Sequence, residues 1–189
     1  GIENTLEETL EFIENLGIEY AEIMHQYPTE NINMNILDSY NLKYTIHAPF
    51  MDVNIAALQW KSRRNSLKQT KDSINLANHI DAEAVVVNPG LAPCLAKKYF
   101  QNKVYDTAID SIKQIKQYSD DLGVLTTIEN MPTFDNMIYS DINDLNEMLV
   151  SLDMPMTLDI GHANHAGYSP DKMIFDSIKH IHIHDNFGD

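Results

Sequence analysis

The sequence predicts an α/β fold built on a parallel sheet, and three observations lead to this prediction. Short apolar runs alternate with amphipathic helical stretches along the 189 residues. The runs resemble parallel strands that are covered on both faces, as in α/β proteins. No glycine-rich phosphate loop follows any run, which disfavours a nucleotide-binding open sheet. Two architectures remain, a doubly wound sheet and part of a (β/α)8 barrel.

Each predicted element has a local signal in the sequence. Leu10 and Ile13 follow helical spacing in the first helix, and Gly17 ends it. Pro49 ends the second predicted strand. The predicted helices span residues 5–16, 32–40, 58–80, 98–122, 141–152 and 170–178. The predicted strands span residues 18–24, 43–49, 82–90, 123–132, 154–162 and 179–186.

Composition and charge narrow the class of protein. A hydrophobic content of 43% is ordinary for a globular domain, and no apolar run approaches the roughly 20 residues that cross a bilayer. The net charge of −15 and the presence of only two arginines disfavour DNA as a partner. The single cysteine, Cys94, fits a reducing cytoplasm. We expect one cytoplasmic domain over residues 1–189, without a membrane partner, and leave a homo-oligomer open.

Polar residues follow a common pattern at the carboxyl ends of four predicted strands. In each strand two polar side chains share a face, and the more ionisable one lies nearer the end. These pairs are Thr45 with His47, Thr127 with Glu129, Thr157 with Asp159, and His182 with His184. Because parallel α/β folds build their active sites at this end of the sheet, the pattern predicts a functional site there.

The ionisable residues are of the types that hold a divalent cation. Glu129, Asp159 and a histidine from HIHIHDN (180–186) offer carboxylate oxygens and an imidazole nitrogen. Such ligands suit Zn²⁺, Mn²⁺, Mg²⁺ or Co²⁺. A metal would also explain how two carboxylates tolerate burial beside one another.

Six segments of the chain together resemble one superfamily. They are LGIEYAEI (16–23), IHAP (46–49), VVNPG (86–90), IENM (128–131), LDIGHAN (158–164) and HIHIHDN (180–186). In this order they resemble the xylose isomerase-like TIM barrels, which include sugar isomerases and epimerases and the endonuclease IV-type AP endonucleases. The resemblance implies a (β/α)8 barrel of which this chain holds strands two to seven, so we expect it to be truncated at both ends.

The resemblance also implies roles for individual residues. The implied metal ligands are Glu129, Asp159 and His182, which begins an H-x-x-[DE] pattern with Asp185; His184 is a less certain ligand. Glu129 and His162 are the implied catalytic residues. The residues expected to bind substrate are His47, Asn88, His162 and His165, the last from its place in the loop after the sixth barrel strand. His180 lies deeper along its strand and is expected in the core.

Three functions fit these residues. The first is a metal-dependent isomerase or epimerase of a sugar or sugar phosphate, acting by proton transfer. The second is a zinc-dependent AP endonuclease, which shares almost every motif but has histidine where this chain has Asn88. Because an amide is a poor zinc ligand, a full three-zinc site is disfavoured. The third is a relative without catalytic activity.

Overall fold

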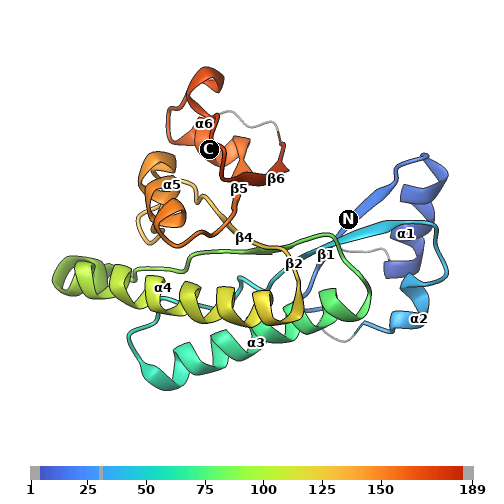
Figure 1. Cartoon of the computed structure of the whole chain (residues 1–189), viewed down its shortest axis with the longest axis horizontal. Helices are drawn as coiled ribbons and strands as arrows, with labels where there is room; N and C mark the ends of the chain where they lie inside the picture. The colour runs from blue at the N-terminus through green and yellow to red at the C-terminus, as the bar shows by residue number, and fades with distance from the viewer. Residues whose placement is uncertain (1–4, 30–31, 185–189) are drawn as a thin grey trace.

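The computed structural model describes residues 5–29 and 32–184, and in this part of the chain six strands alternate with helices (Figure 1). The strands are β1 (Tyr20–Met24), β2 (Lys43–His47), β3 (Val85–Val87), β4 (Thr126–Glu129), β5 (Met156–Asp159) and β6 (Ile178–His182). The helices are α1 (Leu6–Asn15), α2 (Met34–Leu37), α3 (Trp60–His79), α4 (Cys94–Leu122), α5 (Ile142–Ser151), α6 (Ile160–His165) and the 3₁₀ helix η1 (Pro170–Lys172).

The strands form one parallel sheet in the order β1-β2-β3-β4-β5-β6. A doubly wound sheet reverses its strand order at a switch point, whereas consecutive strands of a (β/α)8 barrel stay neighbours. The predicted α/β class with a parallel sheet is therefore confirmed. The sequential order is consistent with part of a (β/α)8 barrel.

The core lies between the sheet and the helices that follow its strands. β3 is buried along its whole length, and so are β4 and β5. Helices α3 and α4 contact each other and lie along one side of the sheet (Figure 1). Among the described residues, no helix combines the length and apolarity that crossing a membrane requires.

Local chemistry explains where several helices begin and end. Thr5 caps α1 in a reciprocal capping box with Glu8. The side chain of Asp141 accepts hydrogen bonds from two backbone N–H groups at the start of α5. Gly123 ends α4 in the left-handed conformation, with φ 70°.

Two predicted elements differ from the structure in kind, whereas the others are shifted only at their ends, by up to four residues. The helix predicted over 170–178 is wrong, because only the short 3₁₀ helix Pro170–Lys172 forms there. Beyond it the apolar residues Met173, Ile174 and Phe175 are consecutive rather than spaced three or four apart, so they do not form one helical face. The strand predicted over 154–162 ends at Asp159, whose side chain accepts the backbone N–H of His162 and so starts α6.

Candidate metal centre

A register shift aligns the last strand with its neighbour. β5 and β6 pair as Met156 with Ile178 but Thr157 with His180, so one extra residue of β6 is accommodated between these pairs. Asp159 then pairs with His182. Because paired residues of adjacent strands point to the same face of a sheet, the bulge brings His180 and His182 to the face that carries Asp159.

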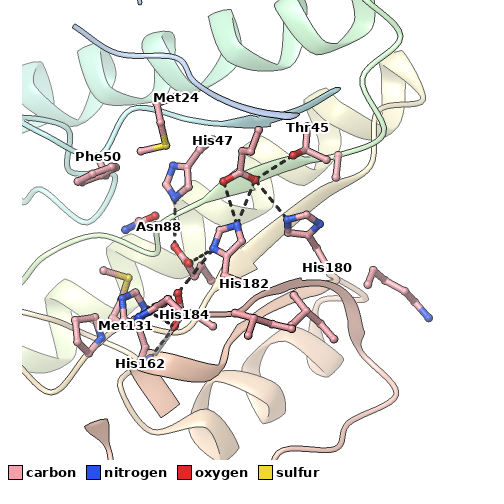
Figure 2. Close-up of a pocket in the computed structure, with 18 of the residues that line it drawn as sticks. Met24, Thr45, His47, Phe50, Asn88, Met131, His162, His180, His182 and His184 are labelled. Carbon is pink, nitrogen blue, oxygen red and sulfur yellow. Dashed lines mark hydrogen bonds and ion pairs between the residues drawn. The ribbon is translucent and has the colours of Figure 1, made fainter. Parts of the chain in front are cut away.

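A cavity of about 820 Å³ lies over this face of the sheet. Each of the six strands, or the residue just after it, contributes a polar or ionisable side chain to the lining: Glu22, His47, Asn88, Glu129, Asp159 and His182. Apolar side chains, including Met24, Phe50 and Met131, complete the lining (Figure 2). A volume of several hundred cubic ångströms is the size of a small-molecule site.

Glu129 is the buried carboxylate at the centre of the polar residues. Its side chain is 3% exposed. Oε1 lies 2.6 Å from Nδ1 of His182, and Oε2 lies 3.3 Å from Nε2 of His47. Burial alone would raise the pKa of Glu129, but hydrogen bonds from His182 and His47 lower it to about 2. The carboxylate is therefore ionised at neutral pH.

His182 lies between two carboxylates. Nδ1 faces Glu129, and Nε2 lies 3.1 Å from Oε1 of Glu22. Burial works against its charge, but the hydrogen bonds with Glu129 and Glu22 raise the pKa of His182 to about 10. Because carboxylates can only accept, both ring nitrogens donate and the imidazole is protonated in the metal-free protein.

Asp159 is held in place by the residue that follows Glu129. The backbone N–H of Asp159 donates to Oδ1 of Asn130 over 2.7 Å, and Nδ2 of Asn130 donates to the carbonyl of Asp159 over 3.0 Å. Asn130 is fully buried. Oδ2 of Asp159 lies 3.9 Å from Nδ1 of His182. The ends of β4 and β5 are thus tied together at the point where their carboxylates meet His182.

Within the described residues, three groups could offer ligand atoms to a cation. In each group the ligand atoms lie within 4.8 Å of one another. The groups are Glu129, Asp159 and His182; Asp159, His162 and His184; and Glu22, His180 and His182. The first group contains three of the four predicted metal ligands, and its two carboxylates and one imidazole fit a divalent cation such as Zn²⁺ or Mn²⁺. The fourth, His184, lies 2.9 Å from Oδ1 of Asp159 in the second group.

Two further predicted site residues, His47 and His162, line the same cavity. Nδ1 of His47 donates to the carbonyl of Ala48 over 2.8 Å. Burial opposes its charge, but the hydrogen bond with Glu129 raises the pKa of His47. Nδ1 of His162 donates to the carbonyl of Asn130 over 2.8 Å, so Nε2 is the nitrogen available to a ligand.

Asn88 and His165, also predicted to bind substrate, occupy different environments. Asn88 lines the cavity, and among the described residues its buried Oδ1 has no hydrogen-bond partner. His165 is not among the described residues that line the cavity; its Nδ1 lies 2.7 Å from Oγ1 of Thr133. Its ring packs edge-on against Phe134, which does line the cavity, with 5.4 Å between ring centroids.

A turn at Gly90 fixes the segment that carries Asn88. Gly90 has φ 110°, and a Cβ there would lie 2.7 Å from Cβ of Ala56. Beside this contact, Oδ1 of Asn54 accepts hydrogen bonds from the backbone N–H groups of Ala56 and Leu91. Glycine is required because other residues could neither adopt this conformation easily nor approach Ala56 so closely.

Two side chains that contact His182 are not among the site residues predicted from the sequence. Glu22 and His180 both face the cavity, and Nε2 of His180 lies 3.4 Å from Oε2 of Glu22. The expectation that His180 lies in the apolar core is wrong. The signal for Glu22 was present, since a charge in the middle of the apolar run YAEIM needs a partner. Asp185, which completes the H-x-x-[DE] pattern, lies outside the described residues.

Comparisons with known proteins agree with this architecture. A family model for xylose isomerase-like TIM barrels matches residues 10–189. Two uncharacterized proteins of Methanocaldococcus jannaschii, MJ1614 and MJ1311, are 35% and 32% identical to this chain and match 83% and 89% of it. The chain spans about three fifths of the length of these relatives, 61% and 60%.

Solved structures share the same fold. The crystal structure of a D-tagatose 3-epimerase-like protein is similar with a TM-score of 0.86 and 28% identity, over 98% of this chain and 74% of that chain. A 3-keto-D-glucoside 4-epimerase from E. coli is similar with a TM-score of 0.82 and 18% identity, over 95% of this chain and 74% of that chain. The second similarity establishes the fold alone.

Proposed function

The chain belongs to the family of xylose isomerase-like TIM barrels, and we propose that it is a divalent-metal-dependent isomerase or epimerase of sugars or sugar phosphates. The observation that carries the proposal is the meeting of Glu129, Asp159 and His182, from consecutive strands, in the lining of one cavity. Similarity to a D-tagatose 3-epimerase-like protein supports a sugar substrate. The fold alone would not decide the reaction, because TIM barrels host many chemistries.

The donor set fits the metal that this chemistry uses. Glu129, Asp159 and His182 would hold Zn²⁺, Mn²⁺, Mg²⁺ or Co²⁺. When bound, such a cation polarises the carbonyl and adjacent hydroxyl of an open-chain sugar and makes the neighbouring C–H more acidic. It would also neutralise two buried carboxylates, whose side chains are 3% and 5% exposed.

Glu129 is the residue that we assign to proton transfer. Its carboxylate is ionised at neutral pH, which is the form that accepts a proton from carbon. Each of its two oxygens has a different neighbour, His182 for Oε1 and His47 for Oε2. Glu129 would thus help to hold the cation beside His182 and would move the proton as a carboxylate steadied by His47.

Hydrogen bonds from the cavity wall would stabilise the charge that develops on the substrate. Nε2–H of His47, which faces Oε2 of Glu129, would donate to an enediolate oxygen, and Nε2 of His162, whose Nδ1 donates to Asn130, would accept from a substrate hydroxyl. Oδ1 of Asn88 would accept a substrate hydroxyl, because a buried acceptor without a partner is costly. We also retain His165 as a substrate residue, acting at the rim beside Phe134.

Isotope exchange tests the proposal directly. The protein is incubated in D2O with Mn²⁺ or Co²⁺ and a panel of ketoses and ketose phosphates, and NMR follows deuterium at the carbon next to the carbonyl. We expect one substrate to exchange and to give an epimer or isomer. Glu129→Gln should lower the exchange rate by about 10²–10⁴-fold, and Asn88→Ala should mainly raise KM.

A different result would contradict the proposal. No exchange with any sugar, combined with cleavage of an abasic-site oligonucleotide that Glu129→Gln abolishes, would assign the site to phosphodiester hydrolysis. An exposed acidic residue provides the matched control. Glu19→Gln, outside the residues that line the cavity, removes the same charge and should leave exchange unchanged.

A further inference from the structure

A third carboxylate lies on the far side of His182 from Glu129. Glu22 lies on β1, the first strand of the sheet, and His182 lies on β6, the last. Oε1 and Oε2 of Glu22 lie 3.1 and 3.2 Å from Nε2 of His182. The Glu22 side chain is 25% exposed.

Two further side chains hold Glu22 in place. Oγ1 of Thr45, the residue paired with Glu22 on β2, donates to its Oε2 over 3.1 Å. Nε2 of His180 lies 3.4 Å from the same oxygen. Figure 2 shows the rings of His180 and His182 next to each other. The carboxylate is thus fixed in front of Nε2 of His182.

The two nitrogens of His182 therefore have separate partners. Nδ1 lies 2.6 Å from Oε1 of Glu129 and 3.9 Å from Oδ2 of Asp159. Nε2 faces Glu22. An imidazole that binds a cation through one nitrogen carries its proton on the other, and a hydrogen bond from that N–H to a carboxylate fixes the ring orientation and makes the ligand more basic.

We infer that Glu22 is a positioning residue, which holds His182 with Nδ1 toward Glu129 and Asp159 and thereby sets the metal affinity of the site. The inference rests on the proposed function, since it takes the Glu129, Asp159 and His182 group as the metal centre. Glu22 acts through His182 and contacts neither the cation nor the substrate.

Glu22 could instead belong to a metal site of its own with His180 and His182. Two observations favour the positioning role. Glu22 already accepts a hydrogen bond from Thr45, and its group has one partly exposed carboxylate. The Glu129 group has two carboxylates that are 3% and 5% exposed, and these need a countercharge more strongly.

Titration with Co²⁺ tests the inference without measuring activity. The metal-free protein is titrated with Co²⁺, and its visible absorption gives the dissociation constant. Glu22→Gln keeps the size of the side chain but removes the charge that accepts the N–H of His182. We expect it to weaken Co²⁺ binding about 10–100-fold. Glu19→Gln, the same charge change three residues away, should alter the constant by less than twofold.

Proton NMR of the Co²⁺ form reports on His182 itself. In the wild-type protein a paramagnetically shifted imidazole N–H should resist exchange with solvent, because it donates to Glu22. In Glu22→Gln this signal should shift or broaden while circular dichroism and the unfolding midpoint stay near the wild-type values. A purely structural role of Glu22 would lower stability without moving this signal.

The outcomes separate the inference from the function on which it rests. If Glu129→Gln abolishes Co²⁺ binding while Glu22→Gln has the wild-type affinity and N–H signal, the inference is overturned and the proposed metal centre stands. If His180→Gln weakens binding as much as Glu22→Gln and changes the Co²⁺ spectrum, Glu22 is a direct ligand and the positioning role is wrong. If the wild-type protein binds no Co²⁺, both the positioning role of Glu22 and the proposed metal centre are wrong.

Discussion

The central and outer strands of the sheet supply different parts of the site. β4 and β5 are buried along their lengths and carry the two carboxylates, Glu129 and Asp159. β1 and β6 are the first and last strands, and side chains along them alternate in exposure. They carry Glu22 and His182, whose side chains are 25% and 19% exposed.

The difference shows two ways of fixing a functional side chain. In the centre, packing on both faces of the strands leaves the carboxylates little freedom. At the outer strands such packing is incomplete, and polar contacts take its place, with His182 held by Glu22 on one side and Glu129 on the other. Because Glu22 on β1 reaches His182 on β6, the sheet is curved enough for its outer strands to face each other.

We expect the largest difference in stability between isoleucine substitutions on the two kinds of strand. Ile128 in β4 is fully buried, whereas Ile181 in β6 is 49% exposed. We expect Ile128→Ala to lower the free energy of unfolding by about 2–5 kcal/mol and Ile181→Ala by about 0.5 kcal/mol or less. Urea unfolding measures both. Similar losses would show that β6 is packed as tightly as the centre.

The same difference explains what the sequence could predict. Glu129 and Asp159 were found because buried parallel strands end at one edge of a sheet, so their positions follow from the strand pattern alone. The contact of Glu22 with His182 spans 160 residues and depends on the curvature of the sheet and on the bulge in β6, which no local pattern encodes. The helix Ile160–His165 was missed because Asp159 serves both as the end of a strand and as a helix cap.

We expect a smaller loss of stability at the end of β4, where polar contacts replace apolar packing. Asn130→Ala removes both hydrogen bonds to the backbone of Asp159 and leaves buried groups without partners. We expect the free energy of unfolding to fall by about 1–3 kcal/mol and Co²⁺ binding to weaken, as measured by urea unfolding and by titration. Asn143→Ala, which removes an exposed bond to Tyr168, is the control and should have little effect.

A pH-dependent effect is expected at the outer strand. The raised pKa of His182 means that its charge stabilises the metal-free protein fully below about pH 6.5, and this stabilisation is lost as the pH rises toward 10. The lowered pKa of Glu129 means that its contribution is present above about pH 4.5 and is lost as the pH falls toward 2.

The unfolding free energies of chelated wild-type protein and His182→Asn should therefore differ most between about pH 4.5 and 6.5, by up to about 2 kcal/mol. The difference should shrink toward pH 10. A difference that grows between pH 6.5 and 10 would contradict the assignment of a protonated His182 between two carboxylates. Because a metal must displace this proton, Co²⁺ affinity should rise with pH over the same range.

The variant with the smallest expected effect, Gly161→Ala, tests whether His182 or His184 is the metal ligand. Gly161 in α6 lies against the ring of His184, and a Cβ there would be 2.0 Å from its Cε1. Gly161→Ala must therefore displace the ring of His184, whose Nε2 lies 2.9 Å from Oδ1 of Asp159. The cost in stability should be small, because the His184 side chain is 46% exposed and can move, and alanine favours the helix by up to about 1 kcal/mol.

If His182 is the ligand, Gly161→Ala should change the Co²⁺ dissociation constant by less than about threefold, because the Glu129, Asp159 and His182 group is left intact. His182→Asn should abolish binding in the same titration. The opposite pattern, with binding lost in Gly161→Ala and kept in His182→Asn, would move the centre to Asp159, His162 and His184. The site would then depend on the more exposed end of the outer strand, and Glu22 would have no metal ligand to position.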